Sequence, residues 1–287
     1  MKTKDKNLNT VKVLVILLIV SMGTVMAQQK TRLVILHTND THSQVEPTDK
    51  STLKTSDMGG YARRMGLIEQ IRAKEKNVLL VDAGDYSQGT PYFNFFNGRV
   101  EIDAMNRMGY DAGTLGNHEF DNGIDTLAVV LKNAKFPMVS SNYKLDKTAL
   151  YSLVKPYVII VRAGLRIGIM ALDVNPESLI FDKNYKGLVY LDPVEKANEV
   201  STLLKKNEKC DVIICLSHLG SDSTKKEVND FEIARKTRYI DVIIGGHSHS
   251  MISNTTVKNA AGKPMVIAQV GKSGLYLGEV ELELEKK

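Results

Sequence analysis

Short apolar runs alternate along this chain with longer segments in which apolar residues recur every three or four positions. The runs at 33–36 and 78–81 are almost wholly apolar, which is typical of buried strands. Tyr61, Met65 and Ile68 recur at helical spacing and predict a helix over 60–75. The same two patterns predict further helices near 100–108, 124–131, 193–207 and 225–237, and further strands at 112–115, 211–216 and 241–244. Strands that alternate with helices favour a largely parallel sheet.

Two regions depart from this alternation. The runs 157–161 and 166–172 flank a short turn and predict an antiparallel hairpin. Near the C-terminus, 265–270 and 275–283 alternate apolar and polar residues, as half-buried or edge strands do. The hairpin and the C-terminal pair of strands predict a second, mixed sheet stacked on the first. Because the sequence has no repeat, low-complexity run or linker, we expect 28–287 to form one α/β domain.

The first 27 residues have a different character. Four lysines precede the apolar run 13–20, and Val25-Met26-Ala27 places small residues at the −3 and −1 positions of a cleavage site. This order predicts a secretory signal peptide over 1–27, cleaved near Ala27, and an exported protein that is periplasmic or secreted. The alternative is an uncleaved anchor helix, since 11–27 is only about long enough to span a bilayer. We expect cleavage and no stable membrane anchor.

Charge and cysteine content narrow the function classes. The formal charge of +5 falls to +2 without 1–27, so a nearly neutral domain gives no basis for an electrostatic stripe that binds a nucleic-acid polymer. Cys210 and Cys215 are the only cysteines, and on one extended strand they lie too far apart for a disulfide. We expect Cys215 in the core, Cys210 at a strand edge, and no disulfide framework.

Five short polar motifs follow the predicted strands. Carboxylate oxygen and neutral imidazole nitrogen are ligands that divalent metals prefer, and an α/β sheet presents such groups at the carboxyl ends of its strands. Six or seven such side chains exceed what one zinc ion needs and suit two metals roughly 3.5–4 Å apart. The motifs are Asp40-Thr41-His42, Gly84-Asp85, Gly116-Asn117-His118-Glu119, Ser217-His218 and Gly246-His247-Ser248-His249.

Spacing suggests how these residues share the metals. Asp40 and His42 are two positions apart, so on an extended segment their side chains would leave the same face. His247 and His249 repeat this arrangement after two glycines that permit a tight turn. Asp85, at the end of a strand, is suited to bridge the two ions.

Asn117 offers an amide oxygen to such a centre, and His218 offers an imidazole nitrogen. Any single motif is explained equally well by a hydrogen-bonded structural turn, but five of them at strand ends are not. His37 lies within strand-like sequence, and we expect a buried histidine that is hydrogen-bonded or supports the metal ligands, rather than a metal ligand itself.

The motifs together resemble those of the 5′-nucleotidase family, which belongs to the calcineurin-like metallophosphoesterases. The resemblance extends over roughly 32–284 and rests on Leu36–Ser43, Asp82–Asp85, Gly116–Asp121, Ser217-His218 and Gly245–His249. It implies a four-layer α/β/β/α sandwich of two stacked mixed sheets. It also implies two divalent metal ions, Zn, Mn, Fe or Co.

The resemblance assigns roles position by position. His118 would approach the phosphate together with Asn117, and Asp121 would orient the His118 imidazole. Some family members have glutamine where this chain has His249. One metal would be held by Asp40, His42, Asp85 and His249, and the other by Asp85, Asn117, His218 and His247.

These features predict an exported, dinuclear metal-dependent phosphoesterase that hydrolyses nucleoside 5′-monophosphates. A 2′,3′-cyclic nucleotide phosphodiesterase or a nucleotide-sugar hydrolase is the enzymatic alternative. Family members usually continue into a second domain whose aromatic residues stack the nucleobase, and this sequence stops at Lys287. A partner chain that supplies substrate recognition is therefore a further expectation. The aromatic cluster Tyr92-Phe93 with Phe95-Phe96 is expected to be core or a sheet-facing helix surface.

Overall fold

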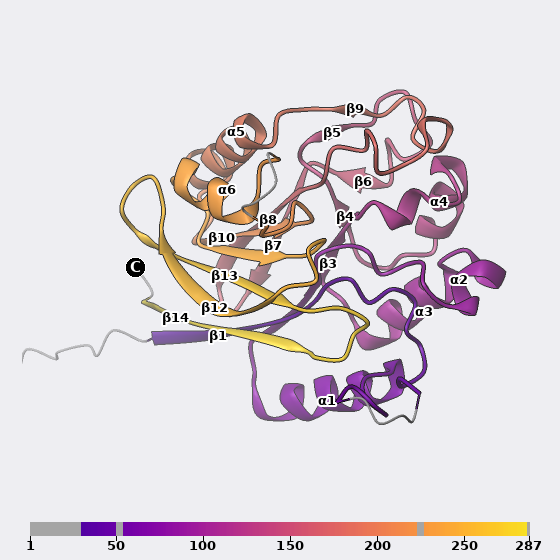
Figure 1. The fold of residues 1–287 in the computed structure, drawn as a ribbon. Coiled ribbons are helices and arrows are strands. Elements are labelled where there is room, and N and C mark those ends of the chain that lie inside the picture. Colours follow the sequence, from indigo (N-terminus) through magenta and orange to yellow (C-terminus); the bar gives the residue numbers. More distant parts are fainter. Residues whose placement is uncertain (1–29, 50–53, 223–226, 286–287) are drawn as a thin grey trace, which may run out of the picture.

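A computed structural model describes residues 30–49, 54–222 and 227–285 (Figure 1). The predicted signal peptide, 1–27, lies outside these residues. Among the helices of the described part, none has the length and apolar character needed to cross a membrane.

Two six-stranded mixed sheets form the centre of the molecule (Figure 1). In the first sheet all neighbours are parallel except one antiparallel edge pair, β14 with β1. Its order is β14 (Gly278–Glu285), β1 (Lys30–Thr38), β2 (Val78–Asp82), β3 (Ala112–Thr114), β4 (Met138–Val139) and β6 (Val154–Lys155).

The second sheet has four parallel central strands and an antiparallel strand at each edge. The predicted hairpin is present as β7 and β8. The order is β12 (Met251–Lys258), β13 (Pro264–Val270), β11 (Val242–Gly245), β10 (Val212–Ser217), β8 (Leu165–Leu172) and β7 (Tyr157–Arg162). A two-stranded sheet is formed by β5 (Tyr143–Lys144) and β9 (Val189–Tyr190).

Helices cover the outer face of each sheet. On the first sheet lie α1 (Tyr61–Lys74), α3 (Arg99–Met108) and α4 (Ile124–Leu131), and on the second lie α5 (Pro193–Lys206) and α6 (Asp230–Lys236). Strand β1 shows why the layers form, because Val34 and Leu36 pack toward the helices while Leu33 and Ile35 pack between the sheets. The predicted four-layer α/β/β/α sandwich is confirmed.

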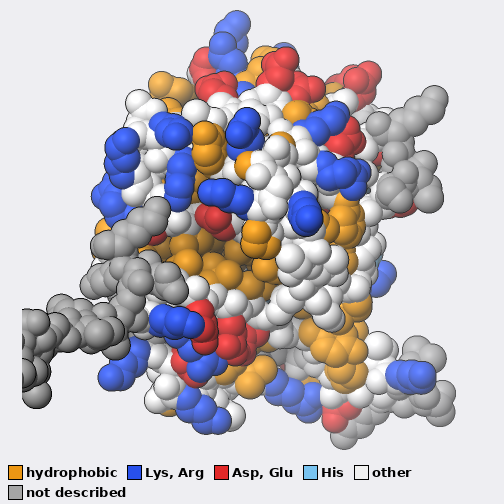
Figure 2. All heavy atoms as spheres, turned by 90° about the vertical axis from the view of Figure 1, so that its left-hand side faces the viewer, with side chains coloured by type: hydrophobic (Ala, Val, Ile, Leu, Met, Phe, Trp, Pro, Cys, Tyr) orange, Lys and Arg blue, Asp and Glu red, His pale blue; other side chains and the backbone are white. Residues whose placement is uncertain are grey.

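Figure 2 shows the face at the left of Figure 1, where apolar side chains line a hollow framed by basic and acidic ones. Strand β1 runs away from this side, so the hollow lies at the amino ends of the parallel strands. The predicted metal site must therefore be sought at the opposite, carboxyl ends.

Several sequence predictions need correction. Cys210 is 2% exposed and packs in the core with Cys215 rather than at a strand edge, and both thiols are free. Phe93, in the short helix α2 (Pro91–Phe96), is buried, whereas Phe95 is 77% exposed, so the aromatic cluster is only partly core. The helix predicted near 225–237 begins at Asp230, and 225–226 lie outside the described residues.

Candidate metal centre

Every predicted ligand follows the carboxyl end of a parallel strand. Asp40 and His42 follow β1, Asp85 follows β2 and Asn117 follows β3, while His218 follows β10 and the two histidines 247 and 249 follow β11. Parallel neighbours present their carboxyl ends at one edge, and here both sheets contribute to the same edge. Residues that are far apart in the sequence are thereby brought together.

The predicted ligands form two adjacent groups of three. Asp40, His42 and His249 offer ligand atoms that all lie within 4.8 Å of one another, and so do Asp85, His218 and His247. In the first group the His42 and His249 Nε2 atoms are 3.1 Å apart. The two groups adjoin, because His218 Nε2 lies 4.0 Å from Asp40 Oδ1.

Asn117, which is predicted to offer an amide oxygen, lies at the edge of the second group. His218 Nε2 lies 3.1 Å from Asp85 Oδ2, and His247 Nδ1 lies 3.1 Å from Asn117 Oδ1. Asp85 also contacts the loop that carries His118, because its Oδ1 accepts a hydrogen bond from the His118 backbone N–H at 2.9 Å. The candidate ligands thus form two neighbouring groups, with Asn117 beside the second.

The polar atoms of these groups fit divalent cations. Asp40 and Asp85 are 0% and 2% exposed, and in the described part of the chain their only ion-pair partners are histidines. The His218 Nε2 atom is buried and has no hydrogen-bond partner. Buried carboxylates without cationic neighbours are costly, and a metal ion satisfies both them and the imidazole nitrogens that face them.

The spacing of the motifs predicted an extended backbone at the candidate ligands, but the backbone there is not extended. Asp40 and His42 have φ values of 47°, Asp85 has 54°, and His247 and His249 have 67° and 54°. All five adopt the left-handed region that L-residues occupy rarely, which is a form of strain that clusters at functional sites. The predicted ligands lie close together, but turns rather than strand alternation bring them there.

Hydrogen bonds behind the ligands fix their orientation. Ala83 O lies 2.7 Å from His218 Nδ1, so this nitrogen carries the proton and Nε2 faces the centre as an acceptor. Glu119, whose role the sequence analysis missed, accepts the backbone N–H groups of Asp85, Ser87 and Gly116. It thereby ties the Asp85 loop to the loop that carries Asn117.

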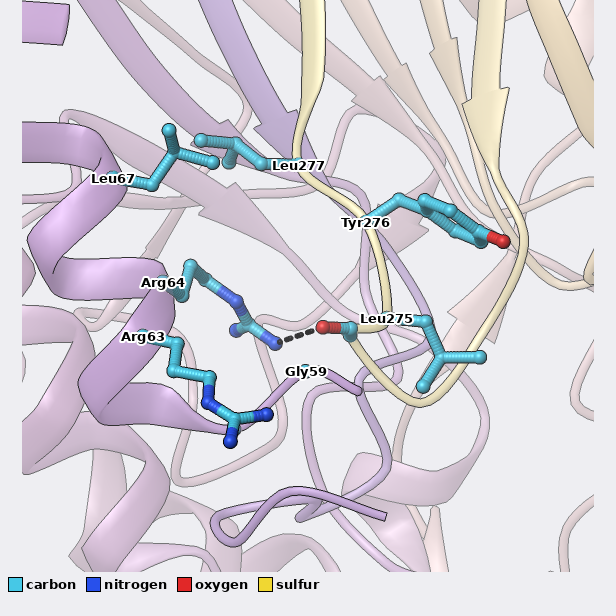
Figure 3. A pocket seen from close by; sticks show the side chains of 9 residues that line it. Gly59, Arg63, Arg64, Leu67, Leu275, Tyr276 and Leu277 are labelled. Carbon is cyan, nitrogen blue, oxygen red and sulfur yellow. Dashed lines mark hydrogen bonds between the residues drawn. The ribbon is translucent and has the colours of Figure 1, made fainter. Parts of the chain in front are cut away.

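The turn at 273–274, which borders the pocket drawn in Figure 3, supports Asp40 from behind. The Ser273 backbone N–H donates to the Asp40 carbonyl at 2.7 Å. Arg64, which is 7% exposed, directs its guanidinium at the Gly274 carbonyl in the same turn, 3.4 Å away, and lies over the Tyr61 ring. Helix α1 thus holds the 273–274 turn against the loop that carries Asp40.

His118 and Asp121 form a pair beside the candidate metal ligands rather than within either group. His118 Nδ1 lies 2.8 Å from Asp121 Oδ2, and its ring centre is 5.4 Å from that of His42. The hydrogen bond to Asp121 raises the pKa of His118 above its ordinary value, although partial burial opposes the charge. Both side chains are about one-third exposed, so the imidazole can reach a bound substrate.

His37 belongs to neither ligand group. It is 1% exposed in β1, and its Nδ1 atom has no hydrogen-bond partner. Burial lowers the pKa of His37 to about 4, so the ring is neutral at physiological pH.

Gly116 leaves room for the Asp85 carboxylate, which gives a testable consequence. A Cβ at position 116 would lie 2.0 Å from Asp85 Oδ1, closer than any real contact. We expect Gly116→Ala to displace this carboxylate and reduce metal content, measured by elemental analysis after refilling. The control is Gly66→Ala in α1, where a Cβ meets nothing within 4 Å; it should retain metal and raise stability by about 0.5–1 kcal/mol. Equal metal content in the two variants would contradict this account of Gly116.

Comparison with known proteins places these features in a family. The calcineurin-like phosphoesterase family matches residues 33–251. A snake venom 5′-nucleotidase from Crotalus adamanteus is 35% identical over 280 residues, which cover 89% of this chain and 46% of that protein. The structure of a 5′-nucleotidase precursor from Thermus thermophilus superposes with a TM-score of 0.80 at 35% identity, covering 90% of this chain and 54% of that one.

A second solved structure, the NAD nucleotidase of Haemophilus influenzae, has a TM-score of 0.79 at 31% identity and covers 90% of this chain and 48% of that one. The chain therefore spans about half the length of these relatives. The family match includes every candidate metal ligand and the His118–Asp121 pair. The chain belongs to the calcineurin-like phosphoesterases, a family of metal-dependent hydrolases, and its relatives include 5′-nucleotidases.

Proposed function

We propose that the chain is a dinuclear metal-dependent phosphoesterase that hydrolyses nucleotide phosphate esters, foremost the monoester of a nucleoside 5′-monophosphate. The observation that carries this proposal is the pair of adjoining ligand groups with the His118–Asp121 pair beside them. The relatives from Crotalus adamanteus and Thermus thermophilus are 5′-nucleotidases, which supports nucleotides as the substrate class.

The proposed chemistry follows from the side chains. Two divalent ions, when bound, lower the pKa of a water molecule toward neutrality and offset the charge of the phosphate oxygens. His118, kept protonated by Asp121, donates a hydrogen bond to the phosphoryl group and stabilises the charge that develops in the transition state. Asn117 would offer its amide oxygen to the second ion and, being next to His118 in the sequence, would border the phosphate.

A second candidate is hydrolysis of a phosphoanhydride or cyclic nucleotide at the same centre. The structural neighbour from Haemophilus influenzae is an NAD nucleotidase, which favours including dinucleotides and nucleotide sugars among the candidates. A separate chain that supplies substrate recognition is a further part of the proposal.

A hydrolysis screen tests the proposed function. The chain, refilled with Mn²⁺, Zn²⁺ or Co²⁺, is incubated with the four nucleoside monophosphates, with 2′,3′-cyclic nucleotides, and with nucleotide sugars and NAD. We expect the highest kcat/KM for the monophosphates. Absence of phosphate release from all of these substrates would overturn the proposal.

We further propose export, with cleavage near Ala27, on the basis of the leader-like composition of 1–27. Mass spectrometry of protein recovered from the envelope fraction of the host should find a chain that begins near Gln28. An intact Met1 in the membrane fraction would favour the anchor alternative.

A further inference from the structure

A cavity of about 240 Å³ opens beside the metal ligand His247. Its walls come from segments that follow the carboxyl ends of the parallel strands β8, β10 and β11, and from the amino end of α5. This is the edge at which α/β sheets bind their ligands. The lining includes Leu179, Tyr190, Asp192, Leu219, Glu227 and His247.

The aromatic and apolar side chains of the lining are suited to contact the organic part of a ligand. Tyr190 is held in place by an edge-on ring contact with Tyr143, at 6.3 Å between ring centres. Leu219 directly follows the metal ligand His218 and is 8% exposed, so the apolar wall begins at the metal centre. Leu179, at 45% exposure, is an apolar side chain at the solvent side that a ligand would cover.

Among the described residues, the charged side chains that line the cavity are all acidic. Asp192 and Glu227 are the carboxylates among the lining residues, and no Lys or Arg of the described chain lines the cavity. Burial and the nearby Asp192 raise the pKa of Tyr190 to about 12, so its hydroxyl stays protonated. Carboxylate oxygens accept hydrogen bonds from hydroxyl and amine groups and repel anions.

We propose that this cavity is a subsite for the uncharged alcohol portion of the substrate, a nucleoside or a similar hydroxyl- and amine-bearing group. This inference rests on the proposed function, since the phosphate is taken to lie at the metal centre. The cavity is smaller than the roughly 300–1,000 Å³ typical of pockets for drug-sized ligands, so it fits part of a substrate rather than a dinucleotide.

Two consequences follow. The described residues contribute to substrate choice through this cavity. A substrate that places a further phosphate in the cavity would bring it against Asp192 and Glu227, which disfavours diphosphates relative to monophosphates.

Titration with adenosine tests the subsite without any hydrolysis. Isothermal titration of the metal-loaded chain should show saturable binding that weakens at least fivefold in Leu179→Ser and in Tyr190→Leu. The matched control is Tyr151→Ala, which removes a 66% exposed tyrosine that is not a lining residue and should bind adenosine as the unmodified chain does. No saturable binding, or equal affinity in all variants, would overturn the subsite.

Kinetics separate this inference from the proposed function. In Leu179→Ser the ratio of kcat/KM for AMP to that for methyl phosphate should fall at least fivefold; an unchanged ratio would overturn the subsite. If the unmodified chain hydrolyses neither ester, the proposed function fails, whereas the adenosine titration still decides whether the cavity binds a nucleoside.

Neutralising the two acidic lining residues tests whether they disfavour a second phosphate. Asp192 Oδ1 caps α5 by accepting the Glu195 N–H at 2.8 Å, and asparagine caps helices equally well. The double variant Asp192→Asn with Glu227→Gln should therefore fold, and its ratio of kcat/KM for ADP to that for AMP should rise at least threefold. The control is Glu195→Gln, on the same helical turn but outside the lining. An unchanged ratio, or an equal rise in the control, would overturn the exclusion of a second phosphate.

Discussion

Replacement of His118 by alanine is expected to lower kcat by roughly 10²–10⁴ while leaving the metal content nearly intact. The imidazole belongs to neither ligand group, and its ring is bonded to Asp121 at 2.8 Å. The contact from position 118 to Asp85 uses the backbone N–H, which the substitution retains. The loss should therefore fall on transition-state stabilisation and not on metal binding.

His218→Ala is the matched comparison, because it removes another imidazole of the same centre. Its Nε2 atom lies 3.1 Å from Asp85 and has no hydrogen-bond partner, as expected of a nitrogen that faces a metal. We expect this variant to lose metal occupancy together with activity. Elemental analysis and kcat measured on both variants decide the roles, and metal loss in His118→Ala but not in His218→Ala would reverse them.

Asp85→Asn is expected to weaken binding of both metals and to abolish most activity. The substitution retains the shape of a side chain that is 2% exposed but removes the negative charge that we assign to the bridge. Substituting a partner of a metal ligand already costs about 10–100-fold in metal affinity, so loss of a bridging ligand should cost more.

Asp173→Asn is the control for Asp85→Asn. Asp173 is a fully buried carboxylate near the same edge, but it is held by the hydroxyls of Thr114 and Ser140. Burial raises the pKa of Asp173 to about 7, so a neutral amide replaces it at small electrostatic cost. Metal titration should give two occupied sites in Asp173→Asn; two tightly bound metals in Asp85→Asn as well would refute the bridge.

The sequence was most informative about elements buried on both sides. Strand β2, apolar at four successive positions, was predictable because a parallel strand covered by helices and a second sheet needs such a run. Strand β12 was missed because its exposed residues carry no apolar alternation, and it forms by pairing with β13. The two-residue strands β4, β5, β6 and β9 are too short to leave any pattern.

The residues that gather at this edge were predictable, but the geometry that unites them was not. The Asp40 and Asp85 loops lie side by side through backbone hydrogen bonds, such as Asp40 N–H to Gly84 O at 2.9 Å, and these contacts set the left-handed turns. The role of Glu119 could not be predicted, because two of the backbone N–H groups that donate hydrogen bonds to it, at Asp85 and Ser87, lie more than 30 positions away in the sequence. The cavity beside His247 was missed because its walls come from separate segments.

The central claim is that two metal ions held by the Asp40 and Asp85 groups are required for phosphoester hydrolysis. The most direct measurement combines elemental analysis with AMP hydrolysis on the same preparation, before chelation, after removal of metal with EDTA, and after refilling. We expect about two metals per chain, loss of activity on chelation and recovery on refilling. Full activity in excess EDTA would contradict the account.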